Sequence, residues 1–70
     1  MAMAERIRIL LVKCNNISES ELARRLNMSP QNLHNKMKRD NFSDKELHEI
    51  ASVTGVAYEA AFVFPDGTRI

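Results

Sequence analysis

The sequence predicts a mainly α-helical domain of four short helices, followed by a C-terminal β-strand or short hairpin. Three observations support this prediction. Apolar residues recur at three- and four-residue spacing over most of the chain, helix-starting serines precede these runs, and the apolar period shortens to two after Val56. With 70 residues, 44% of them hydrophobic, the chain has room for one small core. Such a core seldom supplies more than about 3–5 kcal/mol of net stability, so a stabilising partner subunit is expected.

The first helix is predicted over about residues 3–14. Its apolar stripe is Ala4, Ile7, Leu10, Leu11 and Cys14, and Asn15-Asn16 then breaks the pattern. Because Cys14 belongs to this stripe, a packed thiol is favoured over a redox sensor.

The second helix begins at the capping box Ser18-Glu19-Ser20-Glu21, in which the serine hydroxyl and the second glutamate each satisfy the other's backbone N–H. Its inward residues are Leu22, Ala23 and Leu26. After the three-residue turn Asn27-Met28-Ser29, a third helix is predicted from Pro30 to about Arg39, because serine is a preferred N-cap and proline suits the first helical position.

The fourth helix begins at a second capping box, Ser43-Asp44-Lys45-Glu46, and ends at Gly55. Its inward set is Leu47, Ile50, Ala51 and Thr54. The lone histidine on this helix, His48, has no second His or Cys at metal-ligand spacing, so no metal site is expected.

A strand is predicted after Val56, because every second residue from Tyr58 to Phe64 falls on one side. The turn that ends in Gly67 allows residues 68–70 to return as a short second strand. An isolated hairpin is marginal in water, so we expect it to pack on the helices and pair with a second copy of the chain. The predicted dimerisation residues are Tyr58, Ala60, Phe62 and Phe64.

Two helices joined by a three-residue turn, with a polar second helix, form a helix-turn-helix arrangement. Leu22-Ala23, the Asn27 turn, the Ser29 N-cap and Leu33 resemble the pattern of Cro/C1-type (XRE-like) helix-turn-helix regulators of bacteria and phages, over about residues 5–55. Asn27 replaces the usual glycine but tolerates the left-handed conformation. Glu19 replaces a frequent glutamine that touches the DNA backbone in that family, and phosphate would repel its carboxylate.

The resemblance implies a lambda-repressor-like fold with a DNA-binding domain over residues 1–55. Residues 56–70 lie outside the common helical pattern of that family, and we expect them to be the dimerisation element of the same domain. It also implies a sequence-specific regulator that binds double-stranded DNA as a homodimer, most simply as a repressor. We expect it to be soluble and cytoplasmic, bacterial or phage-encoded and associated with the nucleoid.

The outward face of the third helix supplies the candidate DNA contacts. Asparagine and glutamine amides pair bidentately with adenine in the major groove, and basic side chains reach phosphates. The predicted base-reading residues are Gln31, Asn32 and Asn35, and the predicted backbone contacts are Ser29, Lys36, Lys38, Arg39, Asn41, Ser43 and Lys45. His34 lies beside this face, either as a further contact or as an ordinary exposed residue. Arg24 and Arg25 are expected to be solvated, with phosphate contact as the alternative.

Charge separates along the chain, which supports a polyanionic partner. Residues 1–39 hold eight basic and three acidic residues, and residues 40–70 hold two basic and six acidic ones. The alternative function is a protein-interaction module or antitoxin-like protein that binds a partner through the C-terminal strand. An enzyme is not expected, because the sequence offers no nucleophile–base pair, phosphate loop or ligand cluster. No cofactor, metal, small-molecule ligand or membrane association is expected either.

Overall fold

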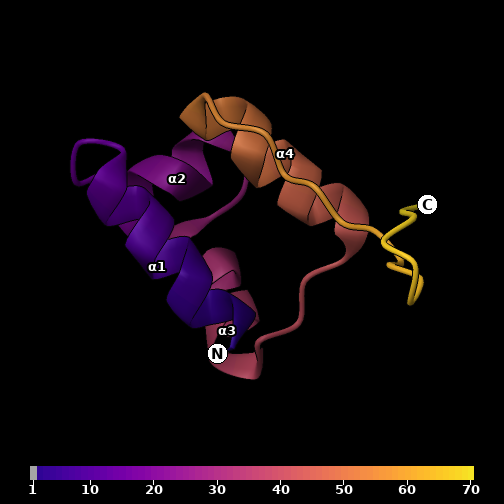
Figure 1. Cartoon of the computed structure of the whole chain (residues 1–70). Helices are drawn as coiled ribbons and strands as arrows, with labels where there is room; N and C mark the ends of the chain where they lie inside the picture. The colour runs from indigo at the N-terminus through magenta and orange to yellow at the C-terminus, as the bar shows by residue number, and fades with distance from the viewer. Residues whose placement is uncertain (1) are drawn as a thin grey trace.

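The computed structural model describes residues 2–70 and contains four α-helices in these residues (Figure 1). They are α1 (Met3–Lys13), α2 (Glu19–Arg25), α3 (Pro30–Arg39) and α4 (Asp44–Thr54). The predicted helix order and the predicted boundaries are therefore confirmed to within a residue or two.

Serine side chains begin three of the helices. The hydroxyls of Ser18, Ser29 and Ser43 each accept a hydrogen bond from the backbone N–H three residues later, at 3.0–3.1 Å. The capping box at Ser43 is complete, because its own N–H donates to Glu46. The box predicted at Ser18 is only half formed, since the Glu21 carboxylate binds arginines one turn further along α2 instead.

Left-handed backbone conformations end or join the helices. Asn27 in the turn before α3 has φ 57°, and Gly55 after α4 has φ 80°, as the sequence predicts. Asp40, which follows α3, also adopts this conformation, with φ 55°. Aspartate is among the few residues that reach it at low cost.

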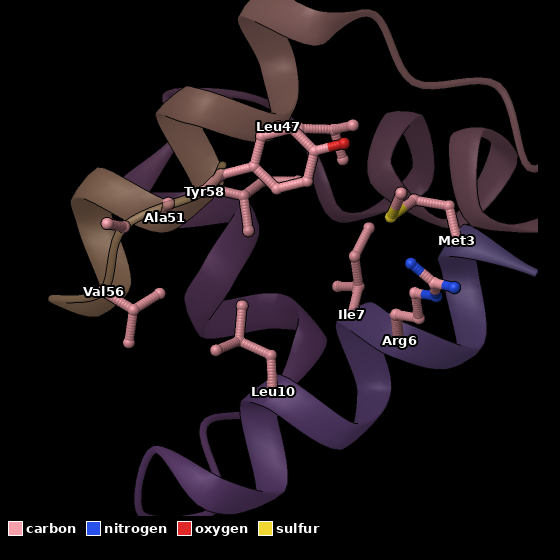
Figure 2. A pocket seen from close by; sticks show the side chains of 10 residues that line it. Met3, Arg6, Ile7, Leu10, Leu47, Ala51, Val56 and Tyr58 are labelled. Carbon is pink, nitrogen blue, oxygen red and sulfur yellow. The ribbon is translucent and has the colours of Figure 1, made fainter. Parts of the chain in front are cut away.

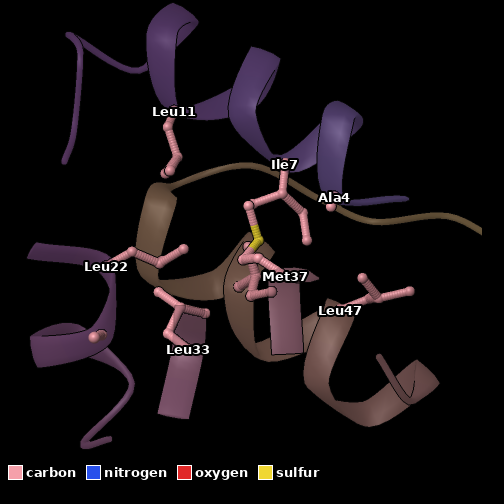
Figure 3. Packing of buried hydrophobic residues seen from close by; sticks show 9 residues of the cluster. Ala4, Ile7, Leu11, Leu22, Leu33, Met37 and Leu47 are labelled. Atoms are coloured by element: carbon pink, nitrogen blue, oxygen red, sulfur yellow. The ribbon is translucent and has the colours of Figure 1, made fainter. Parts of the chain in front are cut away.

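The core lies between the four helices, where Leu22 of α2 and Leu33 of α3 are its most deeply buried large side chains (Figure 3). Buried residues of α1 and α4 complete the core around these two leucines. The remaining buried side chains are Ala4, Ile7, Leu11, Ala23, Met37, Leu47, Ile50 and Ala51.

Four residues predicted to face inward are only half-buried, namely Leu10, Cys14, Leu26 and Thr54. Cys14 caps the end of α1 and is only half-buried, with its thiol 3.7 Å from the Thr54 carbonyl oxygen. Helical spacing also places Pro30 on the side of Leu33 and Met37, but Pro30 is exposed, because the first residue of α3 projects beyond the core.

The predicted strand after Val56 is not formed. Within residues 2–70 the only β pairing is an isolated antiparallel bridge between Val63 and Arg69, closed by the turn at Gly67, where φ is 92°. The rest of the segment runs back along α4 and places the small hairpin beside the start of that helix (Figure 1). An alternating pattern permits a strand, but the ladder needs a second strand, and residues 68–70 are long enough for one bridge only.

Tyr58 has a different role from the three other residues predicted for dimerisation. It is half-buried against the core, and its ring meets that of His48 edge-on, with the centroids 5.3 Å apart. Ala60, Phe62 and Phe64 are exposed. Tyr58 thus attaches the segment to α4, and the apolar part of the hairpin projects from the domain.

No helix in residues 2–70 has the length and apolar character required to cross a membrane.

Candidate nucleic-acid interface

Helix α3 is fixed on the domain by one side and presents the opposite side outward. Leu33 and Met37, four residues apart, are both buried, with exposed fractions of 1% and 3%. The turn from α2 is held by backbone hydrogen bonds that Leu26, Asn27 and Met28 donate to carbonyls of α2. The recognition surface, as we call the outward side of α3 with its two ends, is therefore carried by a rigidly packed helix.

The three predicted base-reading residues share this surface. Gln31 and Asn32 are exposed and Asn35 is half-buried. The Gln31 amide nitrogen donates to the Asn35 amide oxygen at 3.1 Å, as expected for side chains one turn apart. The second N–H and the carbonyl oxygen of Gln31 stay available, which is the pair of groups that binds adenine bidentately.

The basic residues at the end of α3 differ in their surroundings. Lys38 and Arg39 are exposed, and in residues 2–70 neither forms an ion pair. Lys36 lies 2.5 Å from a Glu46 carboxylate oxygen at the start of α4. Lys45 is exposed and only loosely paired with Glu49, at 4.0 Å.

Three further predicted backbone contacts lie at the ends of the helices. The hydroxyls of Ser29 and Ser43 already accept capping hydrogen bonds, so each has its O–H left to donate. Asn41 is exposed, and its backbone N–H donates to the Lys36 carbonyl at 3.2 Å. Beside it, a polar recess of about 230 Å³ is lined by Met28, Asn32, Asn35, Lys36, Arg39 and Asn41.

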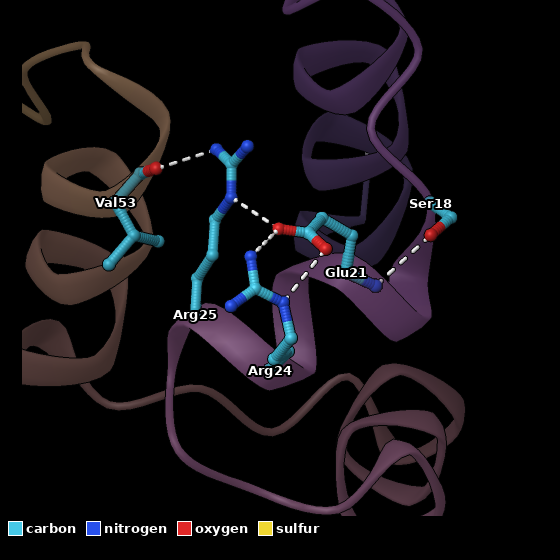
Figure 4. A network of polar contacts seen from close by, with 5 residues as sticks. All are labelled: Ser18, Glu21, Arg24, Arg25 and Val53. Atoms are coloured by element: carbon cyan, nitrogen blue, oxygen red, sulfur yellow. Dashed lines mark hydrogen bonds and ion pairs between the residues drawn. The ribbon is translucent and has the colours of Figure 1, made fainter.

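The two arginines of α2, predicted to be solvated, form a network with Glu21 (Figure 4). Both guanidinium groups bind the Glu21 carboxylate, and Arg25 also donates to the Val53 carbonyl of α4 at 3.0 Å. Hydrogen bonds from Arg24 and Arg25 lower the pKa of Glu21 to about 2. The 21/24/25 spacing of opposite charges could have indicated this pairing, whereas the contact with Val53 depends on the tertiary fold.

Asp40 is a residue that the sequence interpretation missed. Its carboxylate accepts a hydrogen bond from the backbone N–H of Ala4, at 2.7 Å. The contact joins the end of α3 to the first turn of α1. No local spacing could reveal a partner 36 positions away.

An apolar recess of about 270 Å³ lies away from the recognition surface, between α1, α4 and the segment that follows α4 (Figure 2). Ile7, Leu10, Leu47 and Tyr58 line it, with Arg6 at its edge.

A capped helix that follows a short turn and carries amide and basic side chains on its exposed side defines a helix-turn-helix DNA-binding domain of a transcription regulator. The family model of the bacteriophage CI repressor helix-turn-helix domain matches residues 5–60. The chain belongs to this family, which confirms the resemblance to Cro/C1-type regulators. No curated protein and no solved structure matches the chain.

Proposed function

We propose that the chain is a sequence-specific transcriptional repressor that binds an operator as a homodimer, with α3 in the major groove. The observation that carries this proposal is the recognition surface itself. It combines side-chain amides with Lys38 and Arg39, which form no ion pair in the part of the chain that the structure describes. The other side of the same helix is buried in the core.

Gln31, Asn32 and Asn35 are the proposed base readers. An amide can donate to N7 and accept from N6 of adenine, so these residues suit operators with adenines in the half-site. His34 is exposed on the flank of the same helix and stands beside this set.

The proposed charged contacts to DNA phosphates are Lys38, Arg39 and Lys45. The proposed neutral contacts are Ser29, Asn41 and Ser43. Cations at the end of α3 and the start of α4 neutralise phosphates and release counterions, whereas hydroxyl and amide donors fix the register of α3 on the DNA. The N-terminus of α3 adds the positive end of the helix dipole.

The C-terminal hairpin is the proposed dimer contact. Phe62 and Ile70 exchange both backbone hydrogen bonds, at 2.7 and 2.9 Å, and Phe64 donates to Thr68 at 2.8 Å. In an antiparallel pair this register turns the N–H and C=O of Val63 away from its partner strand. That edge could pair with the same edge of a second copy around a two-fold axis.

Side chains support the same contact. Phe62, Phe64 and Ile70 share one side of the hairpin by this register, and Phe62 and Ile70 are 78% and 72% exposed. Pairing two hairpins would double this apolar side and lengthen the ladder. In this arrangement Ala60, Phe62 and Phe64 lie at the contact, and Tyr58 anchors it to the helices.

A homodimer of this kind calls for an approximately palindromic operator with half-sites one helical turn apart, about 34–36 Å. Occlusion of a promoter is then the simplest mechanism of repression. Selection from a pool of random duplex DNA at two salt concentrations tests the proposal. We expect enrichment of a two-fold symmetric site and weaker retention at higher salt, and an absence of enrichment at either salt would refute it.

A second function is favoured by one observation, the exposed aromatic hairpin. A sheet edge with Phe62 beside it could instead accept a strand of another protein, with the helices as a scaffold. The same selection separates the two functions, since a scaffold retains no DNA at low salt.

A further inference from the structure

We propose that Lys36 is a positioning residue, which holds α3 against the start of α4 through Glu46 and does not contact a DNA phosphate. This inference rests on the proposed function, because it divides the basic residues of the recognition surface into two kinds. It also departs from the sequence prediction, in which Lys36, Lys38 and Arg39 act alike.

Glu46 uses both of its carboxylate oxygens. One lies 2.5 Å from the Lys36 ammonium, and the other accepts the backbone N–H of Ser43 at 2.9 Å. The carboxylate therefore serves the capping box of α4 and the contact with α3 at once. Because the capping box fixes the Glu46 carboxylate on α4, the ion pair holds the Lys36 ammonium at a fixed position.

The backbone of Lys36 strengthens the same joint. Its carbonyl accepts hydrogen bonds from the N–H groups of Asp40 and Asn41, which follow α3. One residue thus ties the end of α3 through its backbone and the start of α4 through its side chain. The angle between α3 and α4 depends on these contacts of Lys36.

Partial burial and opposite charge stabilise the ion pair between Lys36 and Glu46. The Lys36 and Glu46 side chains are only about one-third exposed, at 34% and 29%. The ammonium, together with the Ser43 N–H, lowers the pKa of Glu46 to about 2, so the carboxylate stays ionised at neutral pH. If Lys36 turned toward DNA, this charge would be left unpaired beside the phosphates.

Salt dependence distinguishes a phosphate contact from a positioning residue. Each phosphate that a cation neutralises contributes about 0.9 to the slope of log K against log salt. We expect Lys38→Gln and Arg39→Gln each to reduce the slope by about that amount. Lys36→Gln should leave the slope unchanged, while it weakens binding by a similar factor at every salt concentration and lowers discrimination between operator and altered operator.

Matched variants distinguish the Lys36–Glu46 ion pair from the role of Glu46 in the capping box. Glu46→Gln keeps a capping-box residue but removes the charge, and Lys36→Arg keeps the cation. We expect Lys36→Gln and Glu46→Gln each to lower Tm by about 2–4 °C, and the double variant to lower it no further than one of them. Lys36→Arg should retain the Tm, slope and selectivity of the wild type.

A slope reduced by about 0.9 in Lys36→Gln, with an unchanged Tm, would overturn the inference. So would fully additive losses of Tm in the double variant. The melting experiments need no DNA, so the inference can fail while DNA binding persists. The absence of any DNA retention by the wild-type chain would instead count against the proposed function.

Discussion

The carboxylate of Asp40 accepts a hydrogen bond from the backbone N–H of Ala4, at 2.7 Å. The residue before α1, Ala2, has no side chain that could cap this helix. Asp40 therefore supplies from the end of α3 the acceptor that an N-cap residue supplies locally. Through this bond the start of α1 and the end of α3 hold each other in place.

Asp40→Ala should destabilise the domain by about 1–2 kcal/mol, because it removes the cap of α1 and places alanine in a left-handed conformation. Asp40→Asn keeps an acceptor and tolerates the same backbone, so it should cost much less. Urea denaturation of the two variants beside the wild type measures both. Equal stability of the alanine variant and the wild type would show that the bond contributes nothing.

Stability should fall as the pH drops from about 4.5 to about 2. The carboxyl of Glu46 has an ordinary pKa of 4.5, which Lys36 and Ser43 lower to about 2 in the folded state. Hydrogen bonds from Arg24 and Arg25 lower the pKa of Glu21 to about 2 as well. A lowered pKa in the folded state contributes stability above the ordinary value, and this contribution is lost as the pH falls through the folded-state pKa. Thermal melts across this range should show a shallower loss for Glu46→Gln, and identical profiles would contradict the assignment.

The helical part of the fold could be predicted because its signals are local. Ser18, Ser29 and Ser43 start helices through bonds that span three residues, and Gly55 ends one through its backbone freedom. The C-terminal strand could not be predicted in the same way, because a strand is completed by a partner that the alternating pattern does not specify.

Gln31→Ala and Asn35→Ala should each lower discrimination between the operator and a base-substituted operator by about 1–3 kcal/mol. The double variant should lose less than the sum, since the hydrogen bond between the two amides couples them. Competition binding with paired duplexes measures the three variants. Unchanged selectivity of Gln31→Ala would mean that α3 does not read the bases.

Phe62→Glu should shift the protein toward monomer and weaken operator affinity, because the second half-site is no longer coupled to the first. Val12→Glu is the matched control, as Val12 is an exposed apolar residue on α1, 64% exposed. Sedimentation velocity should find the control dimeric at the same concentration. A dimeric Phe62→Glu variant would move the dimer contact to the helices.

Val63→Pro tests the register of that contact. The hairpin bonds involve Phe62 and Phe64, so proline at position 63 spares them but removes the N–H of the free edge. We expect sedimentation velocity to find Val63→Pro as a monomer, and a dimeric variant would contradict pairing through this edge.

Part of the candidate site was also accessible from sequence alone. The 100° helical spacing places Gln31 and Asn35 outward and Leu33 inward, and the structure agrees. The different surroundings of Lys36 and Lys38 were not accessible, because Glu46 reaches Lys36 only once α3 and α4 are packed. Spacing on one helix says nothing about a carboxylate on the next.

Backbone amide shifts of the ¹⁵N-labelled chain, recorded as an enriched operator duplex is added, test the DNA-facing role of α3 most directly. We predict that the largest changes fall on residues 29–41, with smaller ones at Ser43 and Lys45. Changes concentrated on Ile9 and Val12, or on residues 60–70 alone, would contradict that role.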